Sequence, residues 1–281
     1  MGSAEEVRVY RQELTDYVNI LRENADDSKI DELAKLRNMD AQVFRDAGLF
    51  FIDKQAEMLV PEYIDKVRDF GVIAVNGKPI YNERYVIPIY DTSGLVMAMV
   101  GYKYGVTERY MYATTKYFNR GDAMYGLENF VEATNAGYGI IAEGIMDALR
   151  LRSFGIKYAF STCGADKSWE RMLNFDLLKR CIFFHDNDRA GKLTEKHWHS
   201  DTELRFIIPK PFKDIDEFAR QNDTTLEYCK DLVLGAVDYI SKTMVPGQRE
   251  RIFLEEVVEV ELEDFVAVRV KQQQSNKMYR A

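Results

Sequence analysis

The 281-residue sequence predicts an α/β protein: an α+β N-terminal subdomain followed by a mostly parallel sheet flanked by helices. Two patterns support this prediction. From residue 137 onward, short apolar runs alternate with amphipathic stretches, which is typical of β-α-β units. Between residues 85 and 104, a turn sequence separates two apolar runs, which predicts a β-hairpin. The length is about twice that of a common domain, so we expect more than one folding unit.

The N-terminal residues 1–36 have a helical pattern and are expected to form an extension. Apolar residues at helical spacing form one stripe: Val7, Tyr10, Leu14, Tyr17, Val18 and Leu21. A second helix is expected to begin near Asp31. A third is expected over residues 39–49, with Asp40 as a candidate N-cap and Gly48 as its stop.

The predicted hairpin consists of residues 85–90 and 95–104, joined by Asp91-Thr92-Ser93-Gly94. Basic and aromatic residues interleave after it: Tyr102, Lys103, Tyr104, Arg109, Tyr110, Tyr112, Lys116, Tyr117, Phe118 and Arg120. Such alternation is found on ordinary solvated surfaces and also in grooves that bind single-stranded nucleic acid. We expect residues 37–135 to form a basic subdomain.

The region from 136 to 222 is predicted to be the parallel-sheet unit. Its expected strands are residues 139–142, 158–161, 181–184 and 204–208, and its expected helices are residues 147–154, 168–178 and 191–199. Residues 223–281 would add a helix to about residue 244 and a possible β-hairpin at 257–270.

Acidic pairs follow three of the predicted strands: Glu143 with Asp147, Asp186 with Asp188, and Asp214 with Asp216. Ligands of parallel sheets lie beyond the carboxyl ends of the strands, so these side chains are expected to share one site. Clustered carboxylates repel one another unless a cation is present. Mg²⁺ or Mn²⁺ fits such oxygen ligands, and two ions can bind the attacking and leaving oxygens of a phosphoryl transfer.

The acidic motifs resemble a known family. Glu143-Gly144-Ile145-Met146-Asp147 and Asp186-Asn187-Asp188-Arg189-Ala190-Gly191 are similar to the Toprim motifs of bacterial DnaG-type DNA primases. Three further segments resemble the primase core: Lys213-Asp214-Ile215-Asp216-Glu217-Phe218, Arg84-Tyr85-Val86-Ile87-Pro88-Ile89, and Phe118-Asn119-Arg120-Gly121-Asp122-Ala123-Met124-Tyr125-Gly126-Leu127. The likeness covers about residues 36–222.

The resemblance implies a Toprim fold and Mg²⁺-dependent synthesis of short RNA primers from nucleoside triphosphates on single-stranded DNA. Its implied catalytic residues are Glu143, Asp186 and Asp188. Its implied metal-site residues are Glu143, Asp147, Asp186, Asp188, Asp214 and Asp216. Its implied nucleotide- and DNA-binding residues are Arg84, Lys103, Arg109, Tyr110, Arg120 and Arg189.

The three cysteines are too far apart to form the C-x₂-C pairs of a zinc ribbon, so no zinc is expected in this chain: Cys163, Cys181 and Cys229. The resemblance therefore implies a separate zinc-binding or initiation factor, or a reduced viral primase, in addition to a replicative helicase as partner. No apolar run approaches the roughly 20 residues of a membrane span. We expect a cytoplasmic protein of a bacterial or virus-infected bacterial cell.

The net charge of −8 argues at first against nucleic-acid binding. However, residues 1–36 contribute −4 and residues 250–264 contribute −6, which leaves +2 for the remainder even with the six site acids included. Two alternatives to a primase stay open at this point: a Toprim-type metal-dependent nuclease, and a non-catalytic module that binds single strands or a helicase.

Overall fold

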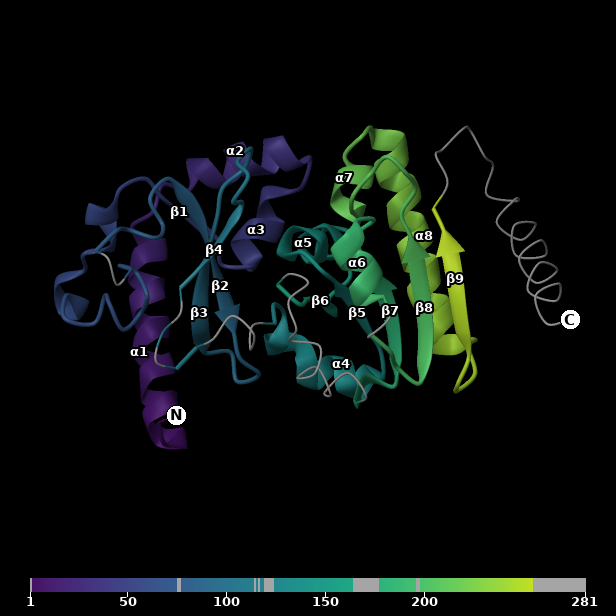
Figure 1. Cartoon of the computed structure of the whole chain (residues 1–281), viewed down its shortest axis with the longest axis horizontal. Helices are drawn as coiled ribbons and strands as arrows, with labels where there is room; N and C mark the ends of the chain where they lie inside the picture. Colours follow the sequence, from purple (N-terminus) through teal and green to yellow (C-terminus); the bar gives the residue numbers. More distant parts are fainter. Residues whose placement is uncertain are drawn as a thin grey trace, which may run out of the picture.

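The chain folds around two β-sheets that lie side by side, with α1 against the first and α8 against the second (Figure 1). The computed structural model describes residues 2–74, 77–113, 115, 117–118, 124–163, 177–195 and 198–254. Arg120, most of the predicted helix at 168–178 and the predicted hairpin at 257–270 lie outside these residues. None of the helices in the described ranges is long and apolar enough to cross a membrane.

The first sheet is antiparallel, with the strand order β1-β2-β3-β4. Its strands are β1 (Phe50–Ile52), β2 (Arg84–Tyr90), β3 (Val96–Tyr102) and β4 (Tyr110–Tyr112). The predicted hairpin is confirmed as β2 and β3. Its turn forms because the Asp91 carboxylate accepts N–H bonds from Ser93 and Leu95, at 2.8 and 3.1 Å, while Gly94 adopts a φ of +81°.

Helices and turns surround the first sheet: α1 (Ala4–Glu23), α2 (Ser28–Arg37), α3 (Ala41–Asp46), η1 (Gln55–Met58) and η2 (Pro61–Tyr63). The predicted apolar stripe of α1 is confirmed, because Leu14, Tyr17 and Val18 are fully buried in the core beside this sheet. Asp40 is the N-cap of α3, as predicted, and accepts the N–H of Gln42 at 2.9 Å.

The second sheet is parallel throughout, which confirms the predicted fold class. Its order is β6-β5-β7-β8-β9, from strands β5 (Gly139–Ala142), β6 (Ala159–Ser161), β7 (Arg180–Phe184), β8 (Thr202–Ile207) and β9 (Arg249–Phe253). The helices of this part are η4 (Leu127–Asn129), α4 (Phe130–Ala136), α5 (Ile145–Ser153), α6 (Arg189–Thr194), α7 (Ile215–Ala219) and α8 (Asp223–Lys242).

The central strands read as continuous apolar runs because both faces of the sheet are covered. In β5, Ile140 packs into the core that contains α8, whereas its neighbour Ile141 packs into the core beside α4. Successive side chains of β7 divide in the same way, with Ile182 on the α8 side and Phe183 on the other.

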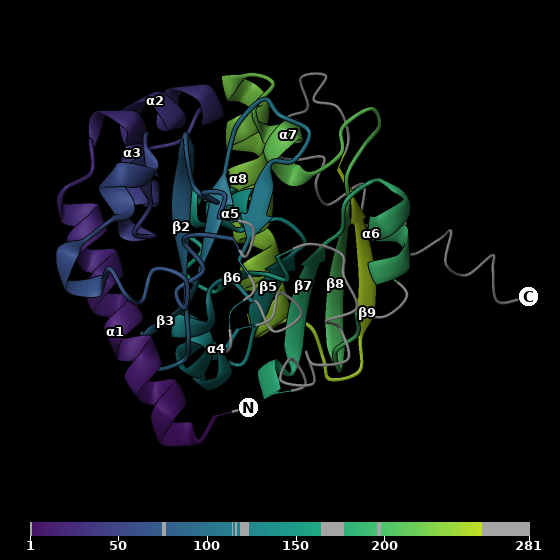
Figure 2. The same cartoon turned by 60° about the vertical axis from the view of Figure 1, so that its left-hand side comes forward.

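Two features of this sheet differ from the sequence predictions. The helix predicted over residues 191–199 is α6, which ends at Thr194, because the Arg205 guanidinium instead binds the carbonyl oxygens of Glu195 (2.9 Å) and Trp198. Strand β9 was not predicted at all. It lies at the edge of the sheet farthest from α1 (Figure 2), and its partly exposed, charged sequence lacks the apolar signature of a buried strand.

Candidate functional site

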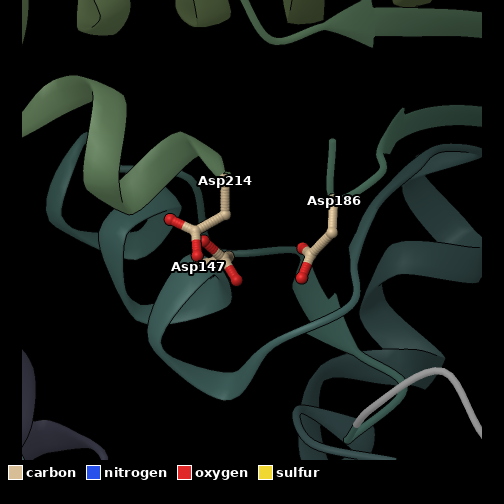
Figure 3. A group of neighbouring side chains, drawn as sticks. All are labelled: Asp147, Asp186 and Asp214. Atoms are coloured by element: carbon tan, nitrogen blue, oxygen red, sulfur yellow. The ribbon is translucent and has the colours of Figure 1, made fainter. Parts of the chain in front are cut away.

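Three aspartates converge beyond the carboxyl ends of adjacent strands of the second sheet (Figure 3). Asp147 lies in the first turn of α5 after β5, Asp186 is the second residue after β7, and Asp214 is the N-cap of α7 after β8. Carboxylate oxygens from the three residues lie within 4.8 Å of one another. We call this group the acidic triad.

Two glycines allow the backbone to approach the acidic triad closely. A Cβ atom at Gly144 would overlap the Asp147 carboxylate, and one at Gly191 would overlap the main-chain carbonyl of Asp186. These are the glycines of the two motifs singled out in the sequence. Their lack of a side chain is therefore required by the geometry of the site.

The electrostatics of the acidic triad favour a bound cation. Burial raises the pKa of Asp147 well above its usual range, and repulsion from Asp214 and Asp186 raises it further. Burial, with a smaller contribution from Asp186, raises the pKa of Asp214 to about 6. Burial also raises the pKa of Asp186, against the opposing effect of Lys213. Three carboxyl groups that resist ionisation together would be stabilised by a divalent ion.

Lys213 contacts this site, although the sequence reasoning assigned it no role. Its ammonium Nζ lies 2.7 Å from Asp186 Oδ2 and 3.6 Å from Asp188 Oδ2. Partial burial lowers the pKa of Lys213, but these acids raise it by more, so the side chain stays protonated. The signal that could have identified it was its place directly before Asp214 in the quoted motif.

Glu143 and Asp188 lie beside the acidic triad. The buried Glu143 carboxylate accepts the main-chain N–H of Asp186 at 3.0 Å and so orients the start of the loop after β7. Asp188 is partly exposed and accepts the N–H of Gly191 at 2.9 Å. Arg189, which follows it, is exposed at the start of α6.

Asp216 is placed differently from the other predicted metal-site residues. Its carboxylate forms ion pairs with three arginines, Arg37, Arg150 and Arg220. It meets the acidic triad through its main chain, because its N–H donates to Asp147 Oδ1 at 3.2 Å.

The predicted DNA- and nucleotide-binding residues that are described lie on the first sheet and its loops, except Arg189, which begins α6 beside the second sheet. Arg84 donates to the carbonyl oxygens of Glu108 and Arg109, at 3.3 Å each, and Lys103 pairs with Glu83 at 2.7 Å. Arg109 is exposed, and its charge opposes in part the rise that burial causes in the pKa of Asp186.

Tyr110 links this region to the second sheet. Its hydroxyl accepts the N–H of Met146, in the first turn of α5, at 3.3 Å. The structure therefore places Tyr110, one of the predicted nucleotide- and DNA-binding residues, next to the helix that carries Asp147.

Comparison with known proteins identifies relatives of this chain. No family model matches it. It is 26% identical over 240 residues to the DNA primase of Thermotoga maritima, which covers 79% of this chain and 42% of that protein. It is 29% identical over 179 residues to the DNA primase of Escherichia coli K12, which covers 57% of this chain and 30% of that protein. The chain thus spans less than half the length of these relatives.

Solved structures show the same fold. A DnaG primase catalytic domain bound to single-stranded DNA matches with a TM-score of 0.62 and 22% identity, over 81% of this chain and 80% of that one. The zinc-binding and RNA polymerase domains of the Aquifex aeolicus primase match with a TM-score of 0.64 and 20% identity, over 85% of this chain and 62% of that one. In sequence this chain is similar to DNA primases, and in fold it matches DnaG primase catalytic domains.

Proposed function

We propose that this chain is the catalytic core of a DNA primase, which makes short RNA primers from nucleoside triphosphates on single-stranded DNA. The observation that carries the proposal is the acidic triad, at the carboxyl ends of the parallel sheet of a chain related to primases over 79% of its length. A DnaG catalytic domain of the same fold has been solved with single-stranded DNA, which supports such a template here.

The acidic triad suits Mg²⁺ or Mn²⁺. All its donors are carboxylate oxygens, which are the hard ligands that these ions prefer, and no cysteine or histidine belongs to the group among the described residues. Burial raises the pKa values of Asp147 and Asp186, and repulsion from neighbouring acids adds to the rise, so a bound cation would favour their ionised forms. When bound, the ion would stabilise the charge that develops on the α-phosphate and on the leaving pyrophosphate.

The residues of this chain would act together around the attack of a 3′-hydroxyl on that α-phosphate. Asp147, Asp186 and Asp214 would hold the cation, and Glu143 would keep Asp186 in place through its main-chain N–H. Lys213 would offer a further positive charge to the triphosphate, because it already lies against the carboxylates of the site.

The basic region would hold the template and the incoming nucleotide. Its proposed members are Arg84, Lys103, Arg109, Tyr110, Arg120 and Arg189. Arg109 is exposed, and its positive charge partly opposes the rise in the pKa of Asp186, which supports its place in this group. A replicative helicase and a separate zinc-binding or initiation factor are further proposed partners, which rest on the family resemblance.

A primer-extension assay tests the proposal. The protein is incubated with Mg²⁺, labelled nucleoside triphosphates and a DNA template to which a short RNA has been annealed, so that no initiation factor is needed. We expect the RNA to be extended, and we expect Asp186→Ala and Glu143→Ala to lose that activity. Asp231→Asn, on the exposed side of α8, removes one acid away from the site and should extend normally.

The same assay separates the alternatives. Cleavage of the template would indicate a nuclease, and binding without either reaction would indicate a non-catalytic module. Full activity in both Asp186→Ala and Glu143→Ala would contradict the proposed site.

A further inference from the structure

The Asp216 carboxylate is enclosed by three arginines that come from different parts of the chain. Arg150 Nη2 lies 3.0 Å from Asp216 Oδ1, and Arg220 Nε lies 2.9 Å from Oδ2. Arg37, which is 179 residues away in sequence, completes the group. The Arg37, Arg150 and Asp216 side chains are each at most 4% exposed. We call these four residues the arginine cage.

Arg37 ties the arginine cage to the first sheet. It lies at the end of α2, and its Nη2 donates to the hydroxyl of Tyr102, the last residue of β3. Its guanidinium carbon also lies 5.2 Å from the centre of the Tyr104 ring. Tyr102 and Tyr104 flank Lys103, so the same cation that binds Asp216 also fixes the strand end that leads into the basic region.

Arg150 binds the end of α2 from the second sheet's side. It belongs to α5, the helix that carries Asp147, and it donates to the main-chain carbonyls of Arg37 and of Asn38, the latter at 2.8 Å. The end of α2 is therefore held both by its own arginine and by an arginine of the second sheet's helix.

Asp216 connects this arrangement to the acidic triad. It lies two residues after Asp214 in the short helix α7, and its N–H donates to Asp147 Oδ1 at 3.2 Å. Any shift of the Asp216 main chain would move both that donor and the turn that presents Asp214.

Charge balance explains why the Asp216 carboxylate is not available to a metal ion. It is the one acid that forms ion pairs with these three guanidinium groups among the described residues. If it turned to a divalent cation, two almost fully buried arginines would lose their counter-ion, which is strongly unfavourable.

We propose that Asp216 and Arg37 are positioning residues, which align the basic region of the first sheet with the acidic triad of the second. This inference rests on the proposed primase function for its kinetic consequence. Apart from Arg189 on α6, each binding site forms within one sheet, so each should bind its own ligand without the alignment. Turnover needs both ligands in the correct relative position, so kcat should depend on the alignment of the two sites.

The kinetic test compares three variants. Arg37→Gln removes the charge from the arginine cage, Arg37→Lys keeps the charge but cannot reach both Asp216 and Tyr102, and Lys35→Gln removes an exposed charge from the same helix as a control. Mn²⁺ affinity and stoichiometry, affinity for single-stranded DNA and kcat for primer extension are measured for each. Asp214→Asn serves as the reference for a lost metal ligand.

For Arg37→Gln we expect kcat to fall about 10- to 100-fold, as for other residues that orient a site, with little change in either affinity. Arg37→Lys should recover part of the loss, and Lys35→Gln should match the wild type. An unchanged kcat in Arg37→Gln would overturn the inference. So would a loss of Mn²⁺ affinity as large as that in Asp214→Asn, or a fall in Mn²⁺ stoichiometry that parallels the fall in kcat.

A distance measurement tests the alignment without any activity. Spin labels are attached at Thr92→Cys, in the β2–β3 turn, and at Asp231→Cys, on α8, since both positions are exposed and the three native cysteines are buried. The distance distribution should broaden in Arg37→Gln and not in Lys35→Gln. An equally narrow distribution in Arg37→Gln would overturn the inference. If the wild type does not extend the annealed RNA, the proposed function fails, whereas this measurement still decides the role of the arginine cage.

Discussion

Asp214 and Asp216 are two residues apart in one motif, yet they lie in opposite electrostatic surroundings. Asp214 faces Asp147 and Asp186 in the acidic triad, where negative charge is in excess. Asp216 faces Arg37, Arg150 and Arg220, where positive charge is in excess. The comparison teaches that a D-x-D motif can place one carboxylate where a cation is needed and use the other to hold buried cations already present.

The largest expected effect is on stability, at the arginine cage. Asp216→Asn leaves buried arginines without a counter-ion, so the free energy of unfolding should fall by about 3–5 kcal/mol. Urea unfolding in the presence of a chelator measures it. A loss no greater than that of the exposed variant Asp231→Asn would show that the arginine cage contributes nothing to stability.

The same chemical change in the acidic triad should have the opposite effect on stability. Asp147→Asn removes a carboxylate whose pKa is raised by burial and by its acidic neighbours, so the metal-free protein should become more stable at neutral pH. Primer extension should fall by about 10²- to 10³-fold, because the cation that would stabilise the transition-state charge loses one of its ligands. Urea unfolding and primer extension on the same preparation test both. A destabilised Asp147→Asn protein would contradict the expectation that the two regions respond in opposite directions.

The response to pH should report the acidic triad. The pKa of Asp214 in the folded protein, about 6, lies above that of the unfolded chain. Its contribution to folding is therefore complete below the pKa of the unfolded chain and is lost as the pH rises through about 6. Mn²⁺ binds the ionised form, so the increase in Tm caused by Mn²⁺ should be larger at about pH 8 than at about pH 5.

Thermal unfolding with Mn²⁺ or with a chelator, at both pH values, checks this expectation. Asp214→Asn is the matched variant and should show a smaller Mn²⁺ effect with a weaker pH dependence. Equal increases in Tm at the two pH values in the wild type would contradict the assignment of Asp214 to the cation site.

The smallest expected effect concerns Lys213. Because its ammonium group lies 2.7 Å from Asp186, it competes with a cation at this carboxylate. Lys213→Met should therefore raise Mn²⁺ affinity by about 3- to 10-fold, a modest change because the side chain is half exposed and screened by water. Calorimetric titration measures it, with the exposed Lys210→Met as control. Weaker Mn²⁺ binding in Lys213→Met would reverse this interpretation.

The fold was predictable wherever its cause is local or periodic. The apolar runs at residues 139–142 and 181–184 predict strands buried on both faces, and the turn from Asp91 to Gly94 predicts the hairpin. Strand β9 escaped prediction because an edge strand with alternating exposure and several charges lacks such a signature. The domain boundaries suggested at residues 36, 135 and 222 stay a prediction.

The proximity of the acids was predictable from the sequence, but the different contacts that each acid makes were not. Strand order along the chain brings the acids after β5, β7 and β8 to one edge, so their proximity follows from the pattern. Glu143, Asp188 and Asp216 carry the same charge and stand in the same motifs, yet their contacts differ from those of the acidic triad.

The sequence by itself determined the α/β class, the parallel sheet and the acidic edge of that sheet, because these depend on residue spacing within short segments. Only the tertiary structure decided which carboxylates face one another and which face arginines. Two of the three arginine partners of Asp216 lie 66 and 179 positions earlier, and no local pattern encodes contacts of that range. Buried charges take their role from the groups that folding brings within a few ångströms, and that is where this chain separates its proposed metal site from the arginine cage.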